Sequence, residues 1–283
     1  MLRRFRGTRR RRAYRGRRGG SDEEHANHRH PSRMTMNRHE VTWWSVSIEA
    51  LGVTGFAALA AVCDDDEMAR AGRFVFERDR LAYLAAHGLL RRALSRVEPS
   101  HGPRAWRFSM GRYGRPELAE QFRCRPRFNL SHCETRVTCV VSGAIPCGVD
   151  VEPLRRRTDR AVMDACLAPS ERARIAQLDD VRCNATFLRL WTLKEAVAKG
   201  VGMGLHMPFC ELAFELEPEL CLRTAPAEAD GPWRLVQHVI DDGHVESLAL
   251  RIDGDAQIAL SRIEWSDSRM TGAGRDYNVA KHV

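Results

Sequence analysis

The feature that most limits how this chain can fold is a weak internal repeat. The segment VSIEAL at residues 46–51 resembles VDVEPL at 149–154, and YLAAHGL at 83–89 resembles FLRLWTL at 187–193. The two offsets differ by a single residue, and in each copy a strand-like segment precedes a helix-like one. Either match alone is compatible with chance. Together they predict an α+β fold of two similar α/β halves in a pseudo-twofold arrangement, joined near residue 145.

The repeat divides the folded part of the chain into an N-terminal α+β half over residues 41–145 and a C-terminal half over residues 146–265. Alternating and helical periodicities, with turn residues between them, define the elements that we expect in each half. The predicted strands are 43–50, 105–110, 128–130, 136–142, 147–152, 211–216, 233–240, 247–252 and 257–265, and the predicted helices are 51–62, 64–73, 77–96, 160–167, 169–178 and 185–199.

Positive charge is concentrated at the N-terminus. The chain carries a net charge of +8, but residues 1–33 hold twelve arginines against three acidic residues, so the remainder is nearly neutral. We expect residues 1–35 to be a disordered tail, or to precede a true start at Met34 or Met36, because they contain almost nothing apolar to bury. An Arg-rich arm can also bind nucleic acid, which is the alternative function for this chain. Residues 266–283 show no periodic pattern and are expected to be flexible.

The cysteine and apolar patterns exclude several classes of protein. The nine cysteines form no CxxC pair and no zinc-ligand spacing, and their number is odd. We therefore expect free thiols in a reducing compartment. The longest apolar segment, residues 51–62, is shorter than the roughly 18 residues that span a membrane, and the N-terminus lacks the apolar segment of a secretory signal. We expect a cytoplasmic protein without membrane association, and a monomer.

Lysine is nearly confined to one segment, WTLKEAVAKG at Trp191–Gly200. Of 45 basic side chains only three are lysine, namely Lys194, Lys199 and Lys281. Helical spacing puts Trp191, Glu195 and Lys199 on one face, and Gly200 stands where helices often end. An exposed helix with an ordinary Glu195–Lys199 pair, worth ~0.3 kcal/mol, is one interpretation. The other is a functional face that needs a compact ammonium rather than a planar guanidinium.

Two carboxylates occupy alternate positions in the segment GVDVEP, residues 148–153. The period of a strand puts Asp150 and Glu152 on one face, where they repel each other unless one is protonated or a cation lies between them. Oxygen ligands favour a hard ion, and Mg²⁺ commonly takes one or two protein carboxylates together with substrate phosphates. The alternative is a solvated strand face that ends at a proline.

Several cationic or polar side chains suit contacts with phosphate. The segment FNLSH places Ser131 and His132 at the end of a predicted strand. His132 can bind an anion or hold an oxygen as a neutral donor, or it is simply structural. With the carboxylates, these groups fit phosphoryl-type chemistry on a pyrophosphate, where positioning and charge neutralisation supply most of the rate. The arginines that suit a phosphate contact are Arg70, Arg73 and Arg115.

The segment GVDVE, followed farther along the chain by WTLKEAVAKG, resembles the paired signature of the 4′-phosphopantetheinyl transferase superfamily. The double-length, surfactin-synthetase-activating (Sfp-like) type fits best, because its members are built as two similar halves. The stretches YGRP at 113–116, FNLSH at 128–132 and AHGLLR at 86–91 also occur in the expected order. The resemblance covers roughly residues 41–216.

This resemblance implies an enzyme that transfers the 4′-phosphopantetheine arm of coenzyme A to a serine of an apo acyl or peptidyl carrier protein and releases 3′,5′-ADP. Asp150, Glu152 and Glu195 would hold Mg²⁺ against the pyrophosphate. Glu195 would also take the serine proton, directly or through water. The N-terminal half would hold the nucleotide of coenzyme A. His132 and Lys199 would steady the phosphates during transfer. The residues that would bind coenzyme A are Arg70, Arg73, Arg115, Ser131, His132 and Lys199.

Some positions depart from the family pattern or add detail to it. Arg115 stands where many relatives have lysine, and the charge is kept. Cys133 follows His132 where a small hydroxyl residue is usual, and we expect it only to pack. Glu171 aligns with an acidic position that some members have near the metal. The resemblance does not indicate whether the carrier belongs to a nonribosomal peptide, polyketide or fatty-acid system.

Overall fold

The central element of the first sheet is strand β1 (Arg38–Ser47), whose apolar side chains are buried on both faces. Trp43 and Trp44 follow each other and therefore point to opposite faces of the strand, and both are buried. β1 pairs in parallel with one strand and antiparallel with another, in a four-stranded sheet of order β11-β1-β5-β4. The other strands of this sheet are β4 (Arg127–His132), β5 (Arg136–Ser142) and β11 (Gln257–Glu264). Strand β11, which the sequence placed with the C-terminal half, thus completes the N-terminal sheet.

A second, antiparallel sheet has the order β6-β10-β9. Its strands are β6 (Cys147–Pro153), β9 (Trp233–Val239) and β10 (His244–Arg251). Two short hairpins lie outside the main sheets, and they consist of β2 (Phe108–Met110) with β3 (Pro116–Leu118), and β7 (Ala213–Glu215) with β8 (Cys221–Thr224).

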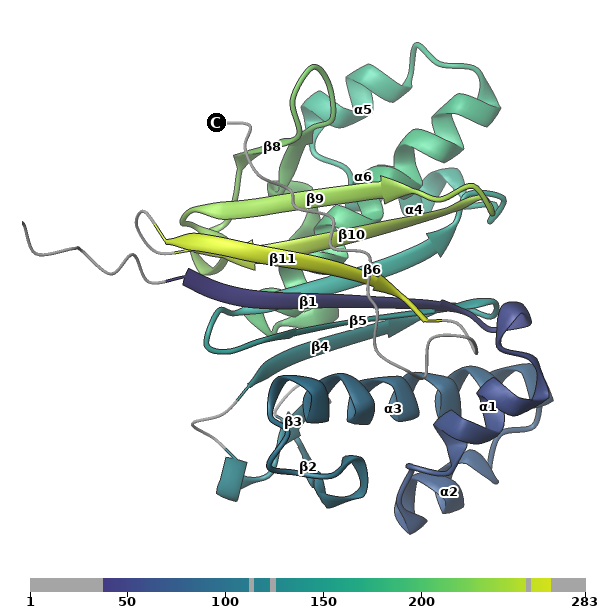
Figure 1. Cartoon of the computed structure of the whole chain (residues 1–283). Helices are drawn as coiled ribbons and strands as arrows, with labels where there is room; N and C mark the ends of the chain where they lie inside the picture. Colours follow the sequence, from purple (N-terminus) through teal and green to yellow (C-terminus); the bar gives the residue numbers. More distant parts are fainter. Residues whose placement is uncertain (1–37, 112–114, 123–125, 253–255, 266–283) are drawn as a thin grey trace, which may run out of the picture. The chain divides into compact units, whose positions relative to one another are not determined.

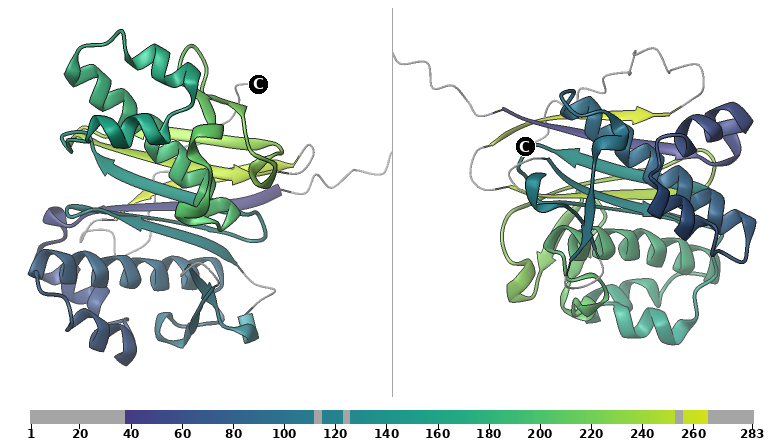
Figure 2. Two further views of the ribbon diagram at one scale, coloured as in Figure 1. Left: turned by 180° about the vertical axis from the view of Figure 1, so that it is seen from behind. Right: turned by 90° about the horizontal axis from the view of Figure 1, so that it is seen from below.

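A group of three helices covers each side of the strands (Figures 1 and 2). The long helix α3 (Glu77–Val97) packs against β4 and β5, and the long helix α6 (Asp180–Val201) packs against β6 and β10. The chain is therefore a mixed α/β protein. No helix in the described part of the chain is long and apolar enough to span a membrane. The short helices are α1 (Gly52–Ala60) and α2 (Asp65–Ala71) on the side of α3, and α4 (Arg160–Cys166) and α5 (Pro169–Ile175) on the side of α6.

The structure is a computed structural model that describes residues 38–111, 115–122, 126–252 and 256–265. The predictions of a disordered tail at 1–35 and a flexible end at 266–283 concern residues outside these ranges. Three large apolar clusters fill the space between the described elements. One lies under α6 and one under α3. The third joins the two sheets through side chains such as Trp43 and Val140 from the first and Val149 and Leu248 from the second.

The contact between α6 and β6 is unusually close. A Cβ atom placed on Gly148 of β6 would lie 2.0 Å from the carbonyl oxygen of Ala196 in α6, so only glycine fits there. Gly200 faces the same strand from inside the helix. The expectation that Gly200 ends the helix is therefore wrong. The helix continues to Val201 and ends at Gly202, whose φ of 93° is the left-handed conformation that glycine adopts readily.

Candidate active site

Three elements bring the sequence-predicted polar residues together, namely β4, β6 and α6. The Ser131 hydroxyl of β4 donates to Asp150 Oδ1 of β6 at 2.7 Å. The Lys199 ammonium of α6 donates to the same carboxylate oxygen at 2.6 Å and to the Ser131 hydroxyl at 3.0 Å. Residues that are far apart in the sequence therefore form one cluster, which we call the Asp150 cluster (Ser131, Asp150 and Lys199).

Asn129 holds β4 in register with β6 at this cluster. Its side-chain oxygen accepts a hydrogen bond from the backbone N–H of Val149 at 2.9 Å, and its side chain is buried. Because alternate residues of a strand share a face, this contact also sets Ser131 against Asp150. The sequence analysis included Asn129 in the FNLSH segment but gave it no role. An amide between two apolar residues of a predicted strand was the available signal.

Two glutamates lie close enough to the cluster to be affected by its charge. Burial raises the pKa of Glu195 to about 7, and the charges of Asp150 and Glu152 act in the same direction while Lys199 opposes them. Burial also raises the pKa of Glu152 to about 7, assisted by the charge of Asp150 and opposed by Arg156 and Lys199. Three carboxylates thus share one region with a single close ammonium, so a further positive charge there would be stabilised.

The chemistry of these carboxylates fits a hard divalent cation. The Oδ2 atom of Asp150 is buried without a hydrogen-bond partner, which leaves a carboxylate oxygen free to take a ligand. Among the described residues, however, no three His, Cys, Asp or Glu side chains already surround a common point as metal ligands. Glu152 is instead paired with Arg156. Oxygen donors of this kind suit Mg²⁺, and the Glu152 side chain must leave Arg156 to contribute.

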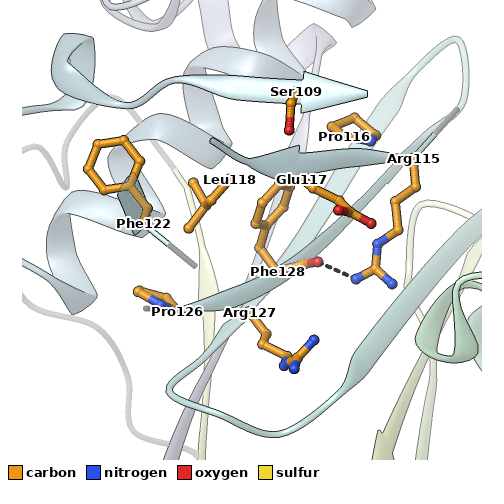
Figure 3. A pocket seen from close by; sticks show the side chains of 9 residues that line it. All are labelled: Ser109, Arg115, Pro116, Glu117, Leu118, Phe122, Pro126, Arg127 and Phe128. Carbon is orange, nitrogen blue, oxygen red and sulfur yellow. Dashed lines mark hydrogen bonds between the residues drawn. The ribbon is translucent and has the colours of Figure 1, made fainter. Parts of the chain in front are cut away.

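Arg115 connects the Asp150 cluster to two neighbouring cavities. Its guanidinium donates to the carbonyl oxygens of Lys199 and Phe128, both at 2.8 Å, and so spans α6 and β4. One cavity of about 330 Å³ has aromatic and polar walls (Figure 3). The other, of about 370 Å³, extends along the end of α6. The first is lined by Ser109, Arg115, Pro116, Glu117, Leu118, Phe122, Pro126, Arg127 and Phe128, and the second shares Arg115, Glu117 and Arg127 with it.

His132 follows the cluster at the end of β4. It lines a third cavity of about 240 Å³, together with Cys133 and residues of α3. The surrounding protein lowers the pKa of His132, and the positive charge of Lys199 lowers it further. A lowered pKa favours the neutral imidazole, and with it the role of a neutral hydrogen-bond donor over that of an imidazolium.

The structure does not bring Arg70 and Arg73 to the Asp150 cluster. Both side chains are exposed at the end of α2. The Arg70 guanidinium lies over the ring of Tyr83, 5.7 Å from its centroid. Neither arginine takes part in the hydrogen bonds of the cluster, so a role for them requires a ligand that extends from the cluster to α2.

Glu171 of α5 and Lys194 of α6 form a buried pair. The Lys194 ammonium, fully buried, lies 2.8 Å from Glu171 Oε2 and donates to the carbonyl oxygen of Phe209 at 2.9 Å. The Glu171 carboxylate also accepts the N–H groups of Ala168 and Phe214. The oxygens of Glu171 are thus occupied by protein donors, and its alignment with an acidic position near the metal stays a prediction. The sequence singled out Lys194 by its rarity but did not predict this partner.

The acidic side chains, the ammonium and the arginine-lined cavities have a chemistry that suits a substrate that carries phosphate. A model of the 4′-phosphopantetheinyl transferase superfamily matches residues 146–258. The 4′-phosphopantetheinyl transferase HetI of Nostoc sp. (strain PCC 7120) is 31% identical over 226 residues, which cover 78% of this chain and 91% of HetI. A phosphopantetheinyl transferase of Thraustochytrium sp. is 28% identical over 78% of this chain and 84% of its own length.

Among solved structures, the holo-[acyl-carrier-protein] synthase of Thermotoga maritima is similar over 40% of this chain and 67% of that chain, with a TM-score of 0.33 and 22% identity. On the strength of the similarity to HetI, the chain belongs to the 4′-phosphopantetheinyl transferase superfamily. The family predicted from the GVDVE and WTLKEAVAKG signatures is thereby confirmed.

Proposed function

We propose that this protein transfers the 4′-phosphopantetheine arm of coenzyme A to a serine hydroxyl of an apo acyl or peptidyl carrier protein. The observation that supports this most is the Asp150 cluster, in which a carboxylate, a hydroxyl and an ammonium from three elements converge beside Glu195. The named relatives are phosphopantetheinyl transferases, which favours this reaction among those that a phosphate site can carry out.

We propose that Asp150, Glu152 and Glu195 would hold Mg²⁺, which when bound neutralises charge on the pyrophosphate. The Glu195 carboxylate accepts the serine proton, directly or through one water. The serine oxygen then forms a bond to the phosphorus that carries the pantetheine arm, and the bond from that phosphorus to the 3′,5′-ADP oxygen breaks. Lys199 stabilises the charge that develops on the leaving group, and the neutral imidazole of His132 donates to a phosphate oxygen.

The nucleotide part of coenzyme A would lie against Arg115 and Ser131. The cavity in Figure 3 has the rings of Phe122 and Phe128 on its walls, and Arg115 and Arg127 at its edge, a lining that suits a planar base next to phosphates. Arg70 and Arg73 would contact the part of the ligand farthest from the Asp150 cluster.

The finer architecture also belongs to this proposal. The long helix α3 on the first sheet and the long helix α6 on the second are the counterparts of the two repeat copies, which supports a pseudo-twofold relation between the halves. We further propose that the protein acts as a monomer in the cytoplasm, where the free thiols of its described cysteines would persist. Nothing in the described residues favours the nucleic-acid alternative, since residues 1–33 lie outside them.

The proposal is tested by incubating the full chain with coenzyme A, Mg²⁺ and a panel of apo carrier proteins. We expect the intact mass of at least one carrier to rise by one phosphopantetheine arm, with one 3′,5′-ADP released per carrier. A parallel reaction without carrier is the control. Release of 3′,5′-ADP in that control at the same rate, with no labelled carrier, would indicate a phosphohydrolase and contradict the proposal.

Replacement of Lys199 by alanine is expected to lower kcat/KM for carrier labelling by ~10²–10³-fold, the usual cost of removing one group that stabilises transition-state charge. Lys199→Arg keeps the charge but not the compact ammonium and should give an intermediate rate. Each variant also loses or alters the ion pair with Asp150, a residue that is 5% exposed. Thermal unfolding of each variant shows whether a lower rate comes from lost stability rather than from lost catalysis. Wild-type activity in a folded Lys199→Ala protein would remove Lys199 from the mechanism.

A further inference from the structure

The turn between β4 and β5 presents a cysteine to the cavity beside His132. This turn consists of residues 133–135 and is closed by a hydrogen bond from the N–H of Cys133 to the carbonyl oxygen of Arg136 at 2.9 Å. The carbonyl oxygen of Thr135 in turn accepts the N–H of Ile48 at 2.9 Å. Cys133 is half-buried and lines the 240 Å³ cavity. The backbone therefore fixes the position of a thiol that small molecules can reach.

A chain of polar side chains runs from this thiol into the protein. The sulfur of Cys133 lies 3.8 Å from the hydroxyl oxygen of Thr135, and that oxygen lies 2.8 Å from Nε2 of His244. The Nδ1 atom of His244 lies 2.7 Å from Asp242 Oδ1. Asp242 is held in turn by Arg136, which donates to its other carboxylate oxygen at 2.6 Å. We call this arrangement the Cys133 relay (Cys133, Thr135, His244 and Asp242).

The relay has the proton arrangement that stabilises a thiolate. An ionised Asp242 accepts the Nδ1–H of His244, and the protonated imidazole donates its Nε2–H to the Thr135 oxygen. The Thr135 hydroxyl proton is then free to point to the sulfur. Burial alone raises the pKa of the Cys133 thiol, but the contacts with His244 and Thr135 outweigh burial and lower it. A thiolate is the form of cysteine that acts as a nucleophile.

Four other cysteines of the described chain provide a contrast. Burial raises the pKa of Cys63 to about 12 and that of Cys147 to about 11, and it also raises the pKa of Cys139 and Cys166. These are the inert thiols expected of an apolar interior. Cys133 therefore differs from the purely packed thiol that the sequence predicts, since its sulfur lies 3.8 Å from the Thr135 hydroxyl oxygen.

We propose that Cys133 is a thiol-modification site, at which the sulfur exchanges with a low-molecular-weight disulfide and the attached group fills the cavity beside His132. The Cys133 thiolate attacks one sulfur of the disulfide, a new S–S bond forms, and the old S–S bond breaks. The departing sulfur leaves as a thiolate and takes a proton from water. Blockage of the cavity then slows the transferase reaction, a consequence that rests on the proposed function, whereas the exchange itself does not.

The exchange chemistry is tested first by alkylation. The full chain is treated with limiting iodoacetamide at neutral pH, and the modified cysteines are located by peptide mass spectrometry. We expect Cys133 to react ~10-fold or more faster than the partly exposed Cys166 and Cys221 and the exposed Cys210. Thr135→Val and His244→Gln should each slow the reaction of Cys133 ~10-fold, with folding checked by circular dichroism. The proposal fails if Cys210 reacts first, or if Thr135→Val folds and leaves the rate unchanged.

A second experiment names the disulfide. Separate samples receive the disulfide of glutathione or the disulfide of coenzyme A, and intact mass and peptide mapping report the attached group. A mixed disulfide at Cys133 with either reagent supports the proposal, and preference for the coenzyme A disulfide would show that the neighbouring site directs it. No mixed disulfide at Cys133 with either reagent overturns it.

The consequence for activity is measured on the same samples. Modified protein should lose most carrier labelling and regain it with dithiothreitol, whereas Cys133→Ser should label carrier at the wild-type rate and ignore both disulfides. If the unmodified protein labels no carrier, the proposed function fails, but the alkylation and exchange results still decide the inference about Cys133.

Discussion

Replacement of Glu195 by glutamine is expected to lower the rate of carrier labelling by ~10⁴-fold or more. Loss of a general base alone usually costs ~10²–10⁴-fold, and this change would also remove an oxygen ligand of the proposed metal site. The side chain of Glu195 is 7% exposed and keeps its shape in glutamine. Because burial disfavours its charged form, the neutral amide should not destabilise the fold. Intact-protein mass of the carrier over time gives the rate.

The matched control is Glu219→Gln, which makes the same chemical change at an exposed position of the chain. It should label carrier at the wild-type rate. Thermal unfolding of both variants should give midpoints close to that of the wild type. Full labelling by a folded Glu195→Gln protein would contradict the role assigned to this carboxylate, whatever the reaction proves to be.

Individual helices and strands were largely predictable, because the spacing of apolar residues within a short segment indicates the element that it forms. Strand β5 was predicted at 136–142, as observed, and the helix predicted at 77–96 is α3 at Glu77–Val97. Helix α6 begins at Asp180 rather than at residue 185. Its first three residues, Asp180–Arg182, are exposed and so add no buried apolar face, and Asp179, whose side chain caps the N–H of Arg182, was the missed signal.

The pairing of distant strands was not predictable from these patterns. Strand β11 pairs in parallel with β1. Nothing in the sequence of residues 257–264 indicates this partner rather than a strand of the C-terminal sheet. The choice depends on apolar surface on both faces of β1 and on ion pairs formed only in the folded protein. The Cys133 relay was missed for the same reason. Asp242 and His244 lie about 110 residues after Cys133, just before and at the start of β10 in the second sheet, and only the fold brings them to the turn that holds Cys133.

For the site, the sequence was more informative, since the charged residues form rare and closely spaced signatures. Asp150 and Lys199 were predicted to act together, and in the structure Lys199 Nζ lies 2.6 Å from Asp150 Oδ1. Which polar side chain holds β4 against β6 could not be read from the sequence. That role belongs to Asn129. Its side-chain oxygen accepts the backbone N–H of Val149, which lies on the edge of β6 that does not pair with β10.

Replacement of Arg136 by methionine is expected to lower the free energy of unfolding by ~3–5 kcal/mol. The reason is that the buried carboxylate of Glu246 would lose one of the cations that compensate its charge. Arg136 lies in β5, is 2% exposed, and donates to Glu246 of β10 at 2.8 Å. It also donates to both oxygens of Glu264 in β11 at 2.5 and 2.7 Å. One guanidinium thus ties the two sheets together. Urea unfolding followed by tryptophan fluorescence gives the free energy.

Glu246 explains why this loss should exceed that of an ordinary ion pair. Its side chain is fully buried, and without Arg136 it keeps Arg262, at 3.0 Å, and the hydroxyl of Ser45. Neutralising it in Arg136→Met/Glu246→Gln should therefore recover part of the lost stability. The control Arg223→Met removes an exposed pair with Glu215 and should leave the free energy of unfolding close to that of the wild type. A loss for Arg136→Met no larger than for Arg223→Met would mean that apolar packing alone joins the two sheets.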